Sequence, residues 1–144
     1  MDTTIEAARP EDADNILRLL EENHLPLEGL REHLGTTIVA RENGRIVGSA
    51  ALERYRDGAL LRSVAVSPAL QGHGLGRQLT DAALGLARQL DVPAVFLLTT
   101  TAERYFPKFG FEPIARAQVP ESVQASVEFT SACPSSAIVM RKSL

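Results

Sequence analysis

Apolar residues recur at helical spacing in three parts of the chain. Residues 9–23 carry a proline and acidic side chains near their start and continue with apolar residues every three or four positions, which predicts an amphipathic helix. Residues 27–34 repeat this spacing more briefly before Gly35, which suits the end of a short helix. A longer apolar stripe over residues 79–90 predicts a third helix, which ends before Pro93.

Between the second and third of these helices, runs of β-branched and apolar residues alternate with turn signals. Asn43-Gly44 divides residues 36–55 into two such runs and predicts a β-hairpin. A second turn, Asp57-Gly58, adds a third antiparallel strand. Residues 94–100, "AVFLLTT", form a short, largely apolar run without glycine, as in a strand buried on both faces. The step from the third strand through a helix to residues 94–100 is a βαβ unit, so these two strands should be parallel.

The last third of the chain predicts shorter elements. Residues 102–110 suggest a short helix, interrupted near its proline and closed by Gly110. Residues 111–119 and 136–144 are strand candidates, with a helical turn at 120–126 between them.

Composition narrows the class of protein. The 144 residues fit one domain, and 44% hydrophobic and 23% charged residues are typical of a soluble globular protein. The formal charge of −3 argues against nucleic-acid binding, which needs a dense basic face. We see neither a signal peptide nor a long apolar span, so we expect a cytoplasmic protein without membrane association. With Cys133 as the single cysteine, we expect no internal disulfide and no metal site built from thiolates, and we expect no metal cofactor.

Candidate chemistry begins at a glycine-rich turn between the third strand and the long helix. Gly72, Gly74 and Gly76 stand at alternate positions, and such a turn presents backbone N–H groups and a helix N-terminus to a phosphate. A dinucleotide-binding fingerprint would need glycine at position 77, which is Arg77. A P-loop would need Lys and Ser or Thr where Arg77 and Gln78 stand.

A third phosphate motif fits. Residues 71–76, "QGHGLG", match the Q/R-x-x-G-x-G/A pyrophosphate loop, and the chain resembles the GNAT acetyltransferases over essentially its whole length. The resemblance also includes the stretches "RPEDADNILRLL", "SVAVSP" and "YFPKFGFEP". It implies an α/β fold with a mixed central sheet of about six or seven strands, whose fourth and fifth strands splay apart, flanked by about four helices.

The same resemblance implies acetyl-CoA as co-substrate and assigns residues to it. The implied cofactor-binding residues are Val64, Ala65, Val66, Gln71, Gly72, His73, Gly74, Leu75, Gly76, Arg77 and Phe106. Pantetheine would run beside residues 64–66, and the Val64 N–H would stabilise the oxyanion, which makes Val64 a catalytic residue. His73 and Arg77 would screen the phosphates, or would be ordinary solvated side chains.

A closer resemblance bears on the substrate. Residues 96–122 and 133–144 look like the arsenic-resistance-associated N-acetyltransferases and, less closely, like glutamate N-acetyltransferases. Both imply a small acidic amino acid, or a glutamate analogue carrying an arsenic or phosphinate group, whose amine accepts the acetyl group. The expected partner is thus a small-molecule amine, and the sequence is also compatible with a homodimer. A CoA-binding regulatory module that has lost catalysis is the alternative function.

Many relatives protonate the leaving thiolate with a tyrosine five residues before the last aromatic of Y-x-x-x-G-F. In this chain that position is Phe106, and Tyr105 comes one residue early, which on a helix is about 100° of rotation. We therefore predict that solvent, or Tyr105 after a local shift, supplies the proton.

Arg62 interrupts the apolar third strand, and a buried guanidinium needs an anionic partner. That partner is either a carboxylate of the protein, such as Glu53 on the neighbouring strand, or an acid group of the substrate held bidentately. We assign Arg62 and Glu53 to the substrate site.

The general base is not defined by the sequence. Glu53, Glu28, His24 and His33 are candidates, although each on its own is expected to be a surface group. Cys133 could carry an acyl group, but a small buried thiol is the simpler interpretation. Tyr55 and Phe129 are interpreted as packing or loop residues.

Overall fold

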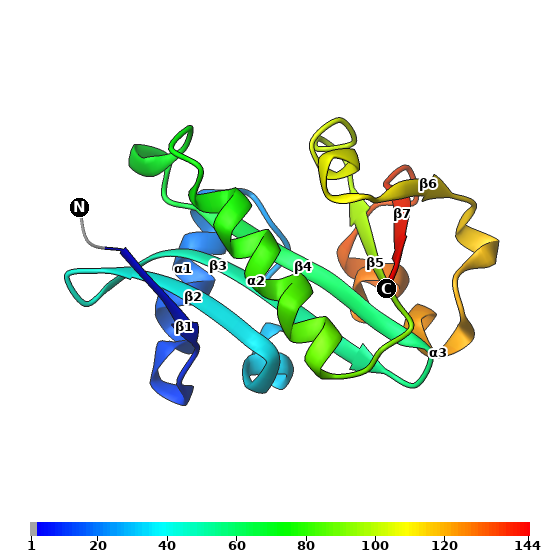
Figure 1. The fold of residues 1–144 in the computed structure, drawn as a ribbon, viewed down its shortest axis with the longest axis horizontal. Helices are drawn as coiled ribbons and strands as arrows, with labels where there is room; N and C mark the ends of the chain where they lie inside the picture. The colour runs from blue at the N-terminus through cyan, green and yellow to red at the C-terminus, as the bar shows by residue number, and fades with distance from the viewer. Residues whose placement is uncertain (1–2) are drawn as a thin grey trace.

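The computed structural model describes residues 3–144, in which seven strands form one mixed sheet in the order β1-β2-β3-β4-β5-β7-β6 (Figure 1). The strands are β1 (Thr3–Ala7), β2 (Thr37–Glu42), β3 (Arg45–Tyr55), β4 (Gly58–Val66), β5 (Ala94–Thr99), β6 (Glu112–Ile114) and β7 (Ile138–Ser143). The fold class inferred from the sequence is confirmed. Among the described residues, no helix is long and apolar enough to span a membrane.

Strands β2, β3 and β4 form the predicted antiparallel meander. Asn43 and Gly44 have φ of 52° and 79°, as a tight hairpin turn requires. The first strand was not predicted, because its five residues include only one large apolar side chain, Ile5. Antiparallel pairing with β2 holds β1 as a strand, with Ile5 opposite Ala40.

Two helices cover the two faces of this part of the sheet. Helix α2 (Leu75–Gln89) crosses one face and α1 (Ala13–Glu22) lies on the other (Figure 1). The apolar side of α2 packs with residues of β2 to β5, and that of α1 packs with Val39, Ala51 and Ala65. Helix α2 begins directly after Gly74 rather than at residue 79, so its first turn starts at the glycine-rich loop.

The parallel strands β4 and β5 separate after two residues. Ala59 pairs with Val95 and Leu60 with Phe96, and the register continues no further. On its other side β4 has an irregularity opposite β3, where Ser63 has φ of 58°. This β-bulge and the missing β5 neighbour leave residues 63–64 outside the regular ladder. The predicted parallel pairing and the splaying of the fourth and fifth strands are both confirmed.

Several elements are shorter or tighter than predicted. Instead of an α-helix, residues Leu30–Thr36 form 3₁₀ turns, and Phe106–Phe109 form another 3₁₀ turn closed by Gly110. Strand β6 stops at Ile114, because Ala115 begins a turn in which the Gln118 side chain accepts its N–H at 3.0 Å. The remaining elements are 3₁₀ turns at Pro10–Asp12, Pro68–Leu70 and Arg116–Gln118, the short helix α3 (Glu121–Gln124) and a π-helical turn, Glu128–Ala132.

Candidate active site

Two cavities meet where β4 and β5 separate. The first, which we call the loop cavity, has a volume of about 420 Å³ and lies between the end of β4 and the start of α2. The second, the wedge cavity, has a volume of about 510 Å³ and opens between β4 and β5. Val64 and Tyr105 line both cavities, so a ligand in one can meet a ligand in the other beside these two residues.

The loop cavity contains most of the residues that the sequence assigned to the cofactor. Nine of them line it: Val64, Ala65, Val66, Gln71, Gly72, Gly74, Leu75, Gly76 and Arg77. His73 is exposed and is not among its lining residues, and Phe106 lines the wedge cavity instead. Asn23, at the end of α1, also lines the loop cavity and was not predicted.

Backbone geometry makes the loop cavity suitable for an anion. Gly72 and Gly74 have φ of 86° and 83°, the left-handed region that disfavours other residues. Gly74 is the residue before α2, so the unpaired N–H groups of the first helical turn begin at this cavity. The Gln71 amide donates to the Val66 carbonyl at 3.0 Å and to the Asn23 side chain at 3.1 Å, which ties the loop to β4 and α1.

Tyr105 lies at the junction of the cavities. Its hydroxyl oxygen is 3.4 Å from the position that a Cβ on Gly76 would occupy, which places it over the first turn of α2. Phe106, at the position that many relatives give to tyrosine, is 8% exposed and packs edge-on against Phe111. Tyr105 precedes the 3₁₀ turn rather than lying within an α-helix, so the expected helical rotation does not apply.

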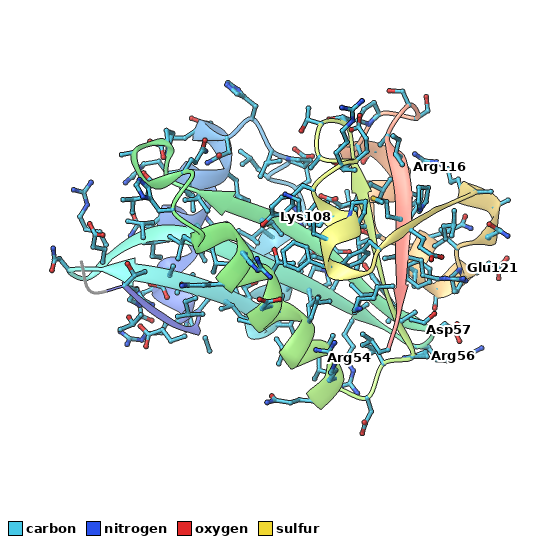
Figure 2. The ribbon with its side chains drawn as sticks, turned by 45° about the horizontal axis from the view of Figure 1, so that its top comes forward. Arg54, Arg56, Asp57, Lys108, Arg116 and Glu121 are labelled. Carbon is cyan, nitrogen blue, oxygen red and sulfur yellow. The ribbon has the colours of Figure 1, made fainter. Side chains whose placement is uncertain are left out.

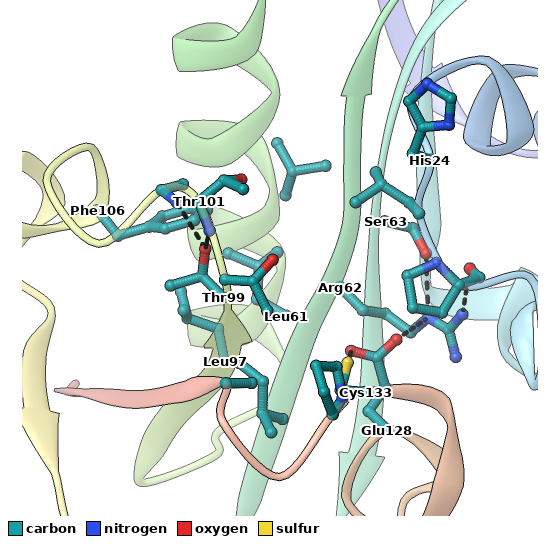
Figure 3. A pocket seen from close by; sticks show the side chains of 18 of the residues that line it. His24, Leu61, Arg62, Ser63, Leu97, Thr99, Thr101, Phe106, Glu128 and Cys133 are labelled. Carbon is teal, nitrogen blue, oxygen red and sulfur yellow. Dashed lines mark hydrogen bonds and ion pairs between the residues drawn. The ribbon is translucent and has the colours of Figure 1, made fainter.

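Arg62 is fully buried at the base of the wedge cavity and is held by the protein itself (Figure 3). Its side chain donates to the Glu53 carboxylate at 2.9 Å and to the Ser63 hydroxyl at 3.0 Å. It also donates to the carbonyls of Glu28 at 2.6 Å and Pro26 at 3.1 Å, in the segment after α1. The protein thus uses four of the five guanidinium N–H groups of Arg62. The expected bidentate grip on a substrate needs two free N–H groups, and only one remains.

Glu53 is the other half of this pair, and the expectation of a surface group is wrong for it, because it is completely buried. Burial acts to raise the pKa of Glu53, but hydrogen bonds from Ser126, Tyr55 and Arg62 outweigh burial and hold the pKa below its ordinary value. The Tyr55 hydroxyl donates to Glu53 at 2.5 Å, and burial together with this bond raises the pKa of Tyr55. A carboxylate so strongly held as an anion is a poor base.

The other residues weighed in the sequence are spread around this centre. His33 is partly buried with its Nε2 atom 3.9 Å from Glu53, whereas His24 and Glu28 are exposed at the edge of the wedge cavity. Tyr55 and Phe129 do not line the cavity and pack in a separate apolar cluster.

Glu128 and Cys133 complete the wedge cavity, and sequence reasoning missed the first of them. Glu128 is 4% exposed, at the start of the π-helical turn. Its carboxylate lies 3.6 Å from Arg62 Nε and accepts the Cys133 S–H at 3.5 Å. Burial raises the pKa of Glu128, and attraction to Arg62 opposes this only in part. Burial and the neighbouring Glu128 raise the pKa of Cys133 to about 12, so Cys133 is a thiol rather than an activated nucleophile.

With this geometry established, comparison with known proteins defines the class. The model of the acetyltransferase (GNAT) domain matches residues 33–113, which include β2 to β5, the loop and Tyr105. The chain belongs to the GNAT acetyltransferase family.

Individual relatives are more specific. The amino-acid acetyltransferase of Mycobacterium tuberculosis is 40% identical over 81 residues, which are 56% of this chain and 46% of that protein. An uncharacterized N-acetyltransferase of Chlorobaculum tepidum is 29% identical over 130 residues, with 85% of this chain and 83% of that protein covered. The chain spans between about a quarter and a half of the length of the amino-acid acetyltransferases that it matches.

Two solved structures show the fold over nearly the whole chain. Rv2747 from Mycobacterium tuberculosis, in complex with CoA and NLQ, has a TM-score of 0.83 at 27% identity and covers 98% of this chain and 99% of its own. N-acetylglutamate synthase from Neisseria gonorrhoeae, complexed with coenzyme A and N-acetyl-glutamate, has a TM-score of 0.84 at 24% identity over all of this chain and 35% of its own.

Proposed function

We propose that this protein is an acetyl-CoA-dependent N-acetyltransferase that acts on the amine of a small amino acid. The observation that carries the proposal is the junction of the two cavities at Val64 and Tyr105. Acetyl transfer needs the thioester and the amine to meet at one point, with donors for the oxyanion and for the leaving thiolate beside it.

The loop cavity fits the pyrophosphate and pantetheine of acetyl-CoA. The backbone N–H groups between Gly72 and Gly76 would bind the pyrophosphate, and the positive end of α2 would favour its charge. Pantetheine would extend along β4, where the separation from β5 leaves strand edges open to a ligand. Acetyl-CoA would supply the activated acetyl group. Rv2747, the relative solved with CoA, supports this assignment.

Two residues would act on the reacting atoms. The Val64 N–H, outside the regular ladder, would donate to the thioester oxygen as negative charge develops there. The Tyr105 hydroxyl would protonate the thiolate that leaves, because Tyr105 lines both cavities where they meet.

The wedge cavity would hold the acceptor. Its lining combines apolar residues with Ser63, three consecutive threonines at 99–101 and the Glu128 carboxylate, which suits a small zwitterion. Amino-acid acetyltransferases among the relatives support an amino acid. For an acidic amino acid, and for arsenic- or phosphinate-bearing glutamate analogues, the support is the sequence resemblance described above.

Release of the CoA thiol from acetyl-CoA tests the proposal. The assay uses the full chain with each protein amino acid and with phosphinothricin, a phosphinate analogue of glutamate. We expect turnover with at least one acceptor, confirmed by mass spectrometry of the N-acetylated product. Tight acetyl-CoA binding without turnover of any acceptor would instead support a CoA-binding regulatory module.

A further inference from the structure

The two carboxylates next to Arg62 differ in how well the protein satisfies them. Glu53 accepts hydrogen bonds from Arg62 at 2.9 Å and from Tyr55 at 2.5 Å. Glu128 is almost as deeply buried, with 6% of its side chain exposed, yet it accepts one weak hydrogen bond, from the Cys133 thiol. Buried carboxylates normally accept several hydrogen bonds, so Glu128 has unused acceptor capacity.

The contact between Glu128 and Arg62 does not fill this capacity. The Arg62 Nε atom is 3.6 Å from Glu128 Oε2, and its hydrogen is directed to the Ser63 hydroxyl at 3.0 Å. Among the described residues, Glu128 Oε2 has no hydrogen-bond donor, although it belongs to a residue that lines the wedge cavity. A ligand with N–H donors in the cavity could satisfy it.

Position along β4 relates Glu128 to the reacting atoms. Glu128, Arg62 and Val64 all line the wedge cavity, and on β4 only the bulge residue Ser63 separates Arg62 from Val64. Because Glu128 Oε2 lies 3.6 Å from Arg62 Nε, the Glu128 carboxylate lies beside β4 (Figure 3), in the same cavity that Val64 lines. An amine between the two could reach the thioester while still bonded to Glu128.

We infer that Glu128 binds the ammonium group of the acceptor and removes its proton. This inference rests on the proposed function. One N–H bond of the ammonium breaks, and the proton moves to the Glu128 carboxylate. The freed electron pair forms the C–N bond at the thioester carbon, and the C–S bond then breaks. The thiolate takes a proton, the nitrogen loses its second one, and Glu128 releases its proton to solvent, so that one proton is produced per turnover.

The surroundings of Glu128 suit a base that works near neutral pH. Burial raises the pKa of Glu128, and the charges of Glu53 and Glu28 raise it further, while Arg62 and the Cys133 thiol lower it. A general base is most effective when its pKa lies near the working pH. Glu53, in contrast, has a lowered pKa and no access to a proton.

The test compares Glu128→Gln with Glu121→Gln, an equivalent change at an exposed glutamate of α3 at the periphery of the molecule (Figure 2). The acceptor is the amino acid that the wild-type protein acetylates best. We expect kcat/KM to fall by about 100-fold or more in Glu128→Gln, the range for loss of a general base, and to stay at the wild-type value in Glu121→Gln. The rise of kcat/KM on the acid side of the pH profile should disappear in Glu128→Gln alone.

Folding and function can be separated in this test. Because its surroundings disfavour the Glu128 anion, the neutral Gln should melt no lower than the wild-type protein at neutral pH. If Glu128→Gln does not fold, Glu128→Asp decides, since a carboxylate drawn back by one methylene should lower kcat/KM but keep the acid limb. A wild-type protein that turns over, with either variant keeping the full wild-type kcat/KM and its pH profile, contradicts this inference alone. A wild-type protein that acetylates nothing removes the proposed function and this inference together.

Discussion

Replacing Arg62 by Ala should destabilise the protein strongly. Arg62 and Glu53 both have side chains with no exposure, and they are joined at 2.9 Å. Removing one partner of such a pair leaves a buried charge uncompensated, which typically costs about 3–5 kcal/mol. The carbonyls of Pro26 and Glu28 also lose their donor. For a chain of this size a loss of that magnitude corresponds to a fall in Tm of roughly 10 °C or more.

Thermal unfolding followed by circular dichroism measures this effect. Arg31→Ala is the control, because the Arg31–Asp14 pair is close, at 2.5 Å, but exposed, with 61% and 80% of the two side chains accessible. Exposed pairs contribute little to stability, so the control should melt near the wild-type temperature. Adding Glu53→Gln to Arg62→Ala should recover part of the loss, since it removes the orphaned anion.

The effect should also depend on pH. Because the pKa of Glu53 is lowered, the stability that the pair contributes is present above the ordinary value of 4.5 and is lost as pH falls through the folded-state pKa. The difference in Tm between wild type and Arg62→Ala should therefore narrow below pH 4.5. An Arg62→Ala protein with wild-type Tm and a greatly raised KM for an acidic amino acid would refute the structural role and support the substrate grip predicted from the sequence.

Three further predictions each concern a single residue. Tyr105→Phe should lower kcat by about 100-fold, the loss of a general acid, and an unchanged kcat in a protein with wild-type Tm would exclude that role. Hydrogen bonds from Arg41 lower the pKa of Asp12, so the stability that this carboxylate contributes is lost as pH falls below 3.8, and Asp12→Asn should remove that pH-dependent part. Urea titrations at pH 3 to 7 measure the free energy of unfolding, and the same pH dependence in both proteins would contradict this prediction. Gly85→Ala should raise the free energy of unfolding by about 0.5–1 kcal/mol, because a Cβ there meets nothing within 4 Å, and a lower Tm would contradict it.

Local signals in the sequence predicted those features that depend on neighbouring residues. Asn43-Gly44 predicted the hairpin because both residues must have positive φ. The alternate glycines predicted the loop before α2, and the βαβ order predicted that β4 and β5 are parallel. The hairpin and the loop each depend on residues within a few positions of one another, and the parallel pairing depends on the rule that a helical crossover joins parallel strands.

Features built by distant residues could not be found in this way. Glu128 is 66 positions from Arg62, and only the fold brings them to 3.6 Å. A glutamate in a polar stretch near the C-terminus looks like a surface residue, and no local pattern marks it as buried. The β-bulge at Ser63 is equally hidden, because a serine with positive φ has no sequence signature. It is held in place by the Ser49 hydroxyl, which donates to the Ser63 carbonyl at 2.7 Å.

Calorimetric titration with acetyl-CoA tests most directly whether the glycine loop binds the cofactor. The comparison is between Gly74→Val and Gly44→Val, because both glycines have positive φ, 83° and 79°, and a Cβ at either meets no protein atom within 4 Å. The backbone strain is therefore similar, but only Gly74 lies in the loop cavity. We predict that Gly74→Val loses acetyl-CoA binding while Gly44→Val keeps the wild-type Kd. A folded Gly74→Val protein that binds acetyl-CoA with wild-type affinity would contradict the account.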